Sequence, residues 1–260
     1  MAARLTAKTD GKAATSWDKD IAPETFPRLN VLGEPPDPLE DYTTYTEVDP
    51  DNAITVAANQ IDVTSATVLN HAYHVYKDKG VDFFNGNFTH LAKARTDRTQ
   101  DAPAHYAFPA SWMIANDVGA WYYSLTVGGK SFLFFSLAIR AGVTEADLYE
   151  SDSGTLYYDY DTGYTLASWY WTKMVRDEAV GTYGTMYSYV YSDSTRTTLV
   201  SSQALTLHTS KKDYRYIYGL NLDASGGTTV AYCADLDLAG APAQSVVPML
   251  FNQLSMQGGD

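Results

Sequence analysis

The sequence predicts an all-β domain in which two antiparallel sheets pack face to face. Between Trp169 and Leu238, strand-like stretches rich in Tyr, Val, Thr and Leu alternate with breaks that carry Gly, Asp, Ser or Lys. These residue types favour pleated, half-buried strands joined by tight turns. About a dozen short strands are expected along the chain, with no amphipathic helix of about twelve residues or more. So many strands require two packed sheets, as in a sandwich or jelly roll.

Composition and charge exclude several classes of protein. The 260 residues include 21 Tyr, and 13% are aromatic, which suits half-buried sheets. A formal net charge of −13 argues against binding to nucleic acid or to an anionic membrane, since both need clustered Lys and Arg. We expect no membrane insertion and no secretory signal, because neither apolar pattern is present. The single Cys233 excludes an intrachain disulfide and is expected to be a small packed residue.

Residues 1–44 are expected to form an extended arm outside the folded domain. The segment EPPDPLED (34–41) cannot continue a helix or a central strand, because proline lacks the backbone donor and restricts its neighbour. Isolated apolar residues in the arm can anchor it to a partner, and a disordered tail is the alternative interpretation. The candidate anchoring residues are Trp17, Phe26, Leu29, Val31 and Leu32.

Regular strand patterns define a sandwich domain over residues 45–240. Within VTEADLYES (143–151), Thr144 and Asp147 have the spacing of a helix cap, so one helical turn can begin there. The tail, residues 241–260, carries apolar residues that need cover from the domain or from a partner. The expected strands cover 54–58, 61–65, 74–78, 82–97, 104–117, 120–127, 130–142, 169–176, 184–192, 203–209, 214–222 and 228–238.

An ordered series of motifs resembles the concanavalin A-like (laminin-G-like) β-sandwich proteins, and in particular those of tailed phages and environmental viruses. The resemblance covers roughly residues 42–238 and implies two curved, stacked sheets with the ligand face on the hollow one. Proteins of this kind also serve as lectins, adhesion modules, glycosidases and virion parts. The motifs are YTEVDPDNAITV, VYKDKGVDFFNGNFTH, WMIANDVGAW, WYWTKMVRDE, GTMYSYVYSDSTRTTLV, LTLHTSKKDYRYIYGLNL and ADLDL.

The resemblance and the arm together predict a structural component of a phage virion, anchored through its termini as a decoration, fibre or tail-associated protein. Such a protein is made in the host cytoplasm and resides in the virion. Its expected partners are other virion proteins and copies of itself in a homo-oligomer. We expect it not to be an enzyme. The alternative is a glycan-binding adhesin for host attachment, and a glycoside hydrolase comes third. No cofactor is predicted, although oxygen-rich loops of sandwiches can bind calcium.

The candidate ligand-binding residues are Tyr187, Tyr189 and Tyr191. Alternation along a strand places these three rings on one sheet face, where they can stack on sugar rings. Packing in the core through cross-strand pairs is the alternative.

Acidic and imidazole groups give no clear catalytic or metal site. Glycosidases with this sandwich use an E-x-D-x-x-E strand; Glu47 and Asp49 are the nearest match, but Asn52 replaces the final Glu. Asp235 and Asp237 share a predicted strand face with Cys233, and we interpret them as solvent-facing. The histidines lack metal-ligand spacing.

Overall fold

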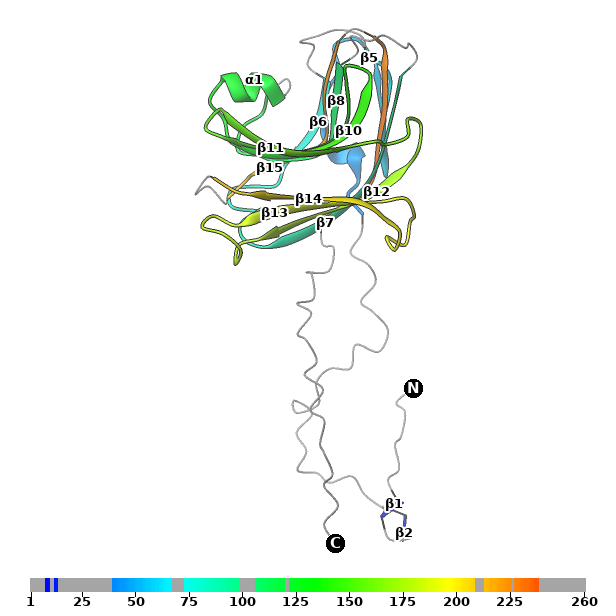
Figure 1. Ribbon diagram of the computed structural model, residues 1–260, viewed down its shortest axis with the longest axis vertical. Coiled ribbons are helices and arrows are strands. Elements are labelled where there is room, and N and C mark those ends of the chain that lie inside the picture. The colour runs from blue at the N-terminus through cyan, green and yellow to red at the C-terminus, as the bar shows by residue number, and fades with distance from the viewer. Residues whose placement is uncertain are drawn as a thin grey trace. The chain divides into compact units, whose positions relative to one another are not determined.

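Two seven-stranded antiparallel sheets pack face to face in the computed structural model of the chain (Figure 1). This arrangement confirms the predicted all-β, jelly-roll sandwich of two antiparallel sheets. The structure describes residues 8–9, 12–13, 39–66, 73–98, 106–119, 122–208, 213–225 and 227–238.

The strands of each sheet come from distant parts of the chain. The first sheet has the spatial order β11 (Thr155–Thr162), β10 (Val143–Asp152), β9 (Phe132–Arg140), β8 (Tyr106–Ala115), β15 (Tyr216–Ser225), β6 (Tyr73–Asp78) and β3 (Thr46–Val48). The second sheet has the order β14 (Leu199–Thr206), β13 (Thr185–Tyr191), β12 (Tyr170–Asp177), β7 (Phe88–Arg98), β16 (Thr229–Asp237), β5 (Gln60–Ala66) and β4 (Ile54–Ala57).

The chain divides into two compact units, Met1–Pro36 and Asp37–Asp260. In the first unit, the described residues form a short antiparallel pair, β1 (Lys8–Thr9) and β2 (Lys12–Ala13). The second unit holds the sandwich and a short 3-10 helix, η2 (Tyr42–Thr44), whose Tyr42 is fully buried. The division into an arm (1–44), a sandwich (45–240) and a tail (241–260) stays a prediction.

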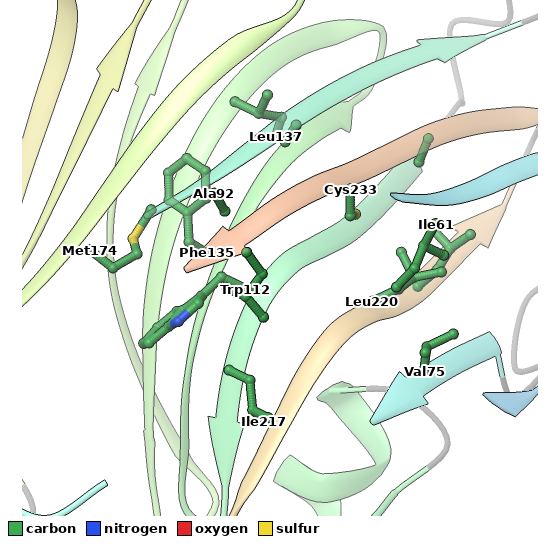
Figure 2. Packing of buried hydrophobic residues seen from close by; sticks show 14 of the residues in the cluster. Ile61, Val75, Ala92, Trp112, Phe135, Leu137, Met174, Ile217, Leu220 and Cys233 are labelled. Carbon is green, nitrogen blue, oxygen red and sulfur yellow. The ribbon is translucent and has the colours of Figure 1, made fainter. Parts of the chain in front are cut away.

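Apolar side chains from both sheets fill the space between them (Figure 2). Trp112 and Phe135 of the first sheet belong to the same buried cluster as Met174 and Cys233 of the second. The Trp112 indole N–H donates a hydrogen bond of 3.0 Å to Nδ1 of buried His90. Burial lowers the pKa of His90 to about 3, which keeps this ring neutral and able to accept that bond. Cys233 is a buried free thiol, as its predicted packing role requires.

Two predicted elements are wrong. Residues 143–151 lie in strand β10 rather than in a helical turn, because Ala146 and Leu148 alternate into the core. The hydroxyl of Thr144, expected to cap a helix, instead donates to the Tyr164 carbonyl. The expected strand at 120–127 contains the helix α1 (Tyr122–Val127), which ends at the glycine pair that follows it.

Helix α1 packs on the outer face of the first sheet, the face turned away from the second sheet (Figure 1). Leu125 of the helix joins a second buried cluster with Phe132, Phe134 and Tyr149. Strand β9 is therefore apolar on both faces, which explains its nearly continuous hydrophobic sequence. In Figure 1 the strands of the first sheet curve toward the side on which α1 lies.

A bulge in β16 corrects the predicted placement of two aspartates. The register of β16 against β7 shifts between Ala234 and Asp237, and Asp235 has a positive φ of 53°. Because a bulge changes the alternation of side chains, Cys233 and Leu236 both reach the core. Asp235 and Asp237 consequently lie on the outer face of the second sheet and do not share a face with Cys233.

Candidate functional site

A row of five buried side chains, four of them polar, crosses the outer face of the first sheet. Strand register places Asp147 opposite Ser136, Ser136 opposite Ala110, Ala110 opposite Asn221, and Asn221 opposite His74. Directly opposed residues of antiparallel strands point to the same face. All five are buried. Ala110 lies at the centre of the row and contributes only a methyl group. The Ser136 hydroxyl lies on one side of it and the Asn221 amide on the other.

Several polar atoms of this face have no hydrogen-bond partner among the described residues. They are the Ser136 hydroxyl, Oδ1 of Asp147, both amide atoms of Asn221, and Oδ1 of Asp223. A buried polar group without a partner costs about 1–3 kcal/mol, so folded proteins nearly always pair such groups. Their concentration on one sheet face marks a place where water or a polar ligand supplies the missing bonds.

An arginine at the end of β9 gathers two carboxylates and a phenol of β10. Nε of Arg140 lies 2.8 Å from a Glu145 oxygen, and Nη2 lies 3.4 Å from Oδ2 of Asp147. The same Nη2 donates a 2.6 Å hydrogen bond to the Tyr149 hydroxyl. Glu145, Asp147 and Tyr149 alternate along the strand and therefore share its outer face. We call these four residues the Arg140 cluster.

Burial raises the proton affinity of two carboxyl groups on this face. It raises the pKa of Asp147 to about 7; Arg140 lowers that pKa and Glu145 raises it further. Burial also raises the pKa of Asp223 to about 6. A carboxyl group with a pKa near 7 can donate or accept a proton at neutral pH. Beside it, the Arg140 guanidinium can stabilise negative charge that develops during a reaction.

Three exposed tyrosines surround the Arg140 cluster. Tyr106 lies opposite Arg140, Tyr160 lies opposite Asp147, and Tyr158 lies opposite Tyr149. Their exposed fractions are 40%, 51% and 53%, respectively. Flat rings of this kind offer stacking surfaces to the apolar faces of a ligand. We call these three residues the tyrosine rim.

The sequence-predicted residues lie elsewhere. Tyr187, Tyr189 and Tyr191 are half-buried on β13, in the second sheet, with the first two rings stacked at 6.4 Å. They face away from the core, since Met186, Ser188 and Val190 are the buried residues of that strand. Their role in sugar binding stays a prediction. The candidate anchoring residues Trp17, Phe26, Leu29, Val31 and Leu32 lie outside the described residues.

An E-x-D-x-x-E spacing occurs at Glu145, Asp147 and Glu150, where the sequence interpretation overlooked it. The register of β10 has no shift, so only Glu145 and Asp147 share the outer face. Glu150 points to the other face, where its carboxylate accepts the His208 backbone N–H. The three carboxylates therefore do not line one cleft. The match at Glu47 and Asp49, identified from the sequence, has a structural role. The Asp49 carboxylate accepts hydrogen bonds from the backbone N–H groups of Ala53 and Ile54.

The described residues contain neither a metal site nor a membrane-spanning helix. Among them, no group of three or more His, Cys, Asp or Glu side chains is arranged to hold a metal ion. No helix in the described part of the chain is long and apolar enough to cross a membrane. Asp223 lies on the first sheet, whereas Asp235 and Asp237 lie on the second.

Comparisons with solved structures find sandwiches of the same kind. An alginate lyase, Aly36B, is 12% identical, with 78% of this chain and 88% of that chain covered at a TM-score of 0.49. The endo-β-1,4-glucuronan lyase of the fungus Trichoderma reesei is 12% identical, with 78% and 90% covered at 0.44. A legume lectin-like domain from Entamoeba histolytica is 8% identical, with 74% and 87% covered at 0.44. The fold is a jelly-roll sandwich of two antiparallel sheets.

No family model and no curated protein matches the chain. At these identities the structural likeness concerns the fold alone. The expectation that the protein is not an enzyme is nevertheless contradicted, because the matching structures include several polysaccharide lyases. That expectation rested on the lack of a catalytic motif in the sequence. It overlooked the carboxylates of β10, which cross-strand register brings to the polar row.

Proposed function

We propose that the protein binds a glycan along the outer face of the first sheet and cleaves it by acid–base catalysis at Asp147. The observation that carries this proposal is a set of buried polar atoms of Ser136, Asp147 and Asn221 that have no hydrogen-bond partner among the described residues. The hydroxyl groups of a sugar can both donate and accept hydrogen bonds. They can therefore pair with the Asn221 amide, the Ser136 hydroxyl and the Asp147 carboxyl once the side chains that cover these buried groups move aside.

The tyrosine rim supports an extended ligand rather than a small ion. Tyr158 and Tyr160 are neighbours on the outer face of the edge strand β11, with ring centroids 6.1 Å apart. Tyr158 also lies 5.3 Å from the Tyr149 ring of the Arg140 cluster. Successive sugar rings can stack on these surfaces while their hydroxyls reach the polar row. A glycan lying from β11 toward β15 meets both features.

Asp147 supplies the proton in this proposal. In its protonated form it donates the proton to the glycosidic oxygen, and the bond from that oxygen to the anomeric carbon breaks as the alcohol departs. Water then adds to the anomeric carbon, and the proton that this water loses returns to the Asp147 carboxylate. Arg140 then stabilises the carboxylate that remains, since its Nη2 already lies 3.4 Å from Oδ2. Arg140 is a third exposed and is the member of the pair that solvent reaches. An approaching ligand therefore contacts the Arg140 guanidinium and the tyrosine rim before it reaches Asp147.

A screen for new reducing ends tests the proposal. We would incubate the full chain with soluble polysaccharides, including a neutral β-glucan and a polyuronate, between pH 5 and pH 8. The Asp147→Asn variant should lose about 100-fold or more of the cleavage rate, the usual scale of general acid catalysis. It should retain binding, whereas Asn221→Ala should weaken binding.

The chain offers a matched control for Asp147. Asp97 also lies 3.4 Å from an arginine, Arg95, but it is on the second sheet and is 30% exposed. Asp97→Asn should leave the cleavage rate within about twofold. If no polysaccharide is cleaved but one binds through Asn221, the face is a binding site without catalysis. If none is bound or cleaved, both parts of the proposal are wrong.

A glycan-binding role without catalysis is the second candidate, favoured by the exposed tyrosine rim. It stays a proposal that the protein belongs to a phage particle, is related to viral proteins, forms a homo-oligomer and binds other virion proteins. The candidate anchoring residues of the N-terminal arm lie outside the described part of the chain. Incorporation of a variant lacking residues 1–44 into particles would contradict anchoring through the arm.

A further inference from the structure

The outer face of the second sheet contains a cavity of about 330 Å³. This volume lies at the lower end of the range for small-molecule sites, about 300–1,000 Å³. The cavity combines one indole, one guanidinium and two carboxylates above an aliphatic floor. It is lined by Leu91, Trp171, Ser194, Arg196, Asp235 and Asp237, with Leu39 at one side.

The β16 bulge brings both aspartates to this cavity. In a regular strand, Asp235 and Asp237 would share the buried face with Cys233. The bulge turns them outward, and the Asp235 backbone N–H is held by a 3.0 Å hydrogen bond to the Asn59 carbonyl. Lys93 lies 4.0 Å from Asp235, so that carboxylate remains close to a cation at the edge of the cavity.

The turn at residues 192–198 positions the guanidinium. The Asp193 carboxylate accepts backbone N–H groups from Thr195, Thr197 and Thr198, at distances between 2.6 and 3.3 Å. This network fixes the turn, in which Arg196 adopts a positive φ of 54°. The Arg196 guanidinium donates to the Ala92 carbonyl at 3.3 Å, which holds the side chain across the sheet. The cation is therefore in place before any ligand binds.

Trp171 connects the cavity to the predicted tyrosine stripe. It lies directly opposite Tyr191, and the neighbouring pairs on the same strands are Lys173 with Tyr189 and Val175 with Tyr187. An aromatic surface thus leads away from the cavity along the outer face of β13. The indole forms the wall at which this surface begins.

We propose that this cavity is a second, non-catalytic binding site for a neutral sugar residue of a glycan. The Trp171 ring stacks on the apolar face of the sugar, and the tyrosine stripe contacts the residues that follow it along the glycan. Asp235 and Asp237 accept hydrogen bonds from the sugar hydroxyls, and Arg196 donates to them. The two carboxylates are balanced by Arg196 and by Lys93 at the edge of the cavity, so the site has no net formal charge and suits a neutral sugar better than an acidic one.

This site is independent of the function proposed for the first sheet. None of its lining residues belongs to the first sheet or to the Arg140 cluster. Loss of cleavage in Asp147→Asn should therefore leave binding at the cavity unchanged. The protein can have this site even if it cleaves no glycan, and it can cleave a glycan even if this site is absent.

The test measures binding of monosaccharides to the full chain by titration calorimetry and saturation-transfer NMR. The probes are D-glucose, D-galactose, D-mannose and N-acetyl-D-glucosamine, with D-glucuronate as the acidic comparison. Trp171→Ala should weaken binding of the preferred neutral sugar at least tenfold. Asp237→Asn should weaken it less.

Trp169→Ala is the matched control. Trp169 lies near the same face, 5.7 Å from the Tyr232 ring and under the Lys93 ammonium at 4.1 Å, but it does not line the cavity. Its substitution should change affinity by less than twofold. Circular dichroism should show both variants folded. The proposal is wrong if none of the neutral sugars binds, if Trp171→Ala binds as well as the parent, or if glucuronate binds more tightly.

Discussion

The two sheets carry the same kinds of side chain on their outer faces but place them in different surroundings. Arg140 and Asp147 on the first sheet lie as far apart as Arg95 and Asp97 on the second, 3.4 Å in each case. Asp147 is fully buried, whereas Asp97 is 30% exposed. Solvent weakens an exposed ion pair, while burial destabilises the ionised carboxylate. The surroundings of the carboxyl group, rather than its distance from the arginine, therefore raise the pKa of Asp147.

Removing the carboxylate of Asp147 should stabilise the protein at alkaline pH. Its pKa in the folded state, about 7, exceeds the ordinary value of 3.8 for an aspartate, so the folded state holds this proton more tightly than the unfolded state. Stability from this group is present below pH 4 and is lost as the pH rises through 7. An asparagine at this position cannot ionise, so the variant keeps this stability as the pH rises. At pH 8, Asp147→Asn should therefore raise the free energy of unfolding by roughly 2–4 kcal/mol.

Chemical denaturation at pH 4 and pH 8 measures this effect. The gain should shrink toward zero at pH 4, where the parent carboxyl is protonated in the folded state. Asp97→Asn should show no comparable gain at pH 8, because that side chain remains in contact with solvent. An equal gain in both variants would remove the distinction between the two faces.

Two buried amides extend the comparison from charges to neutral groups. Asn221 on the first sheet has no hydrogen-bond partner among the described residues, whereas Gln203, which points into the core from the second sheet, is paired. The Gln203 amide donates to the Ala146 carbonyl at 2.7 Å and accepts from the Ser188 hydroxyl. Gln203→Leu should cost about 1–3 kcal/mol, because it leaves both partners unsatisfied.

Asn221→Leu should instead be neutral or stabilising by about 1 kcal/mol, since no protein partner is lost. Thermal and urea denaturation of both variants give the two values. A destabilisation of Asn221→Leu as large as that of Gln203→Leu would show that Asn221 serves the fold. Binding of glycan should fall in Asn221→Leu even where the fold gains stability.

The fold was predictable because it depends on local signals. Alternation and turn residues located strands β12 to β16. Strand β10 was missed because Thr144 and Asp147 have the spacing of a helix cap, and its acidic residues obscure an alternation that the core requires. Helix α1 was missed because its aromatic residues favour strands. Tertiary packing decided both segments.

The candidate site was not predictable from the sequence by the same means. Asp147, Ser136, Ala110, Asn221 and His74 come from separate strands, and only cross-strand register brings them into one row. A strand register slip of one residue would turn each side chain to the other face. The bulge that moves Asp235 outward carries no turn signal. The E-x-D-x-x-E spacing at Glu145 was visible, and a search over the whole chain would have directed attention to β10.

The smallest expected effects concern the tyrosine rim. Tyr158→Ala and Tyr160→Ala each remove a stacking surface beside the Arg140 cluster, and each should weaken glycan binding about 3- to 10-fold, the scale of one aromatic contact near 1 kcal/mol. Tyr183, with a similar exposure of 37% but a position outside the first sheet, is the control and should have no effect when changed to Ala. Affinity electrophoresis in polysaccharide gels resolves differences of this size.

Because the rings are exposed, none of these changes should alter the unfolding midpoint. Weakened binding in the Tyr183 variant would mean that the ligand does not follow the outer face of the first sheet.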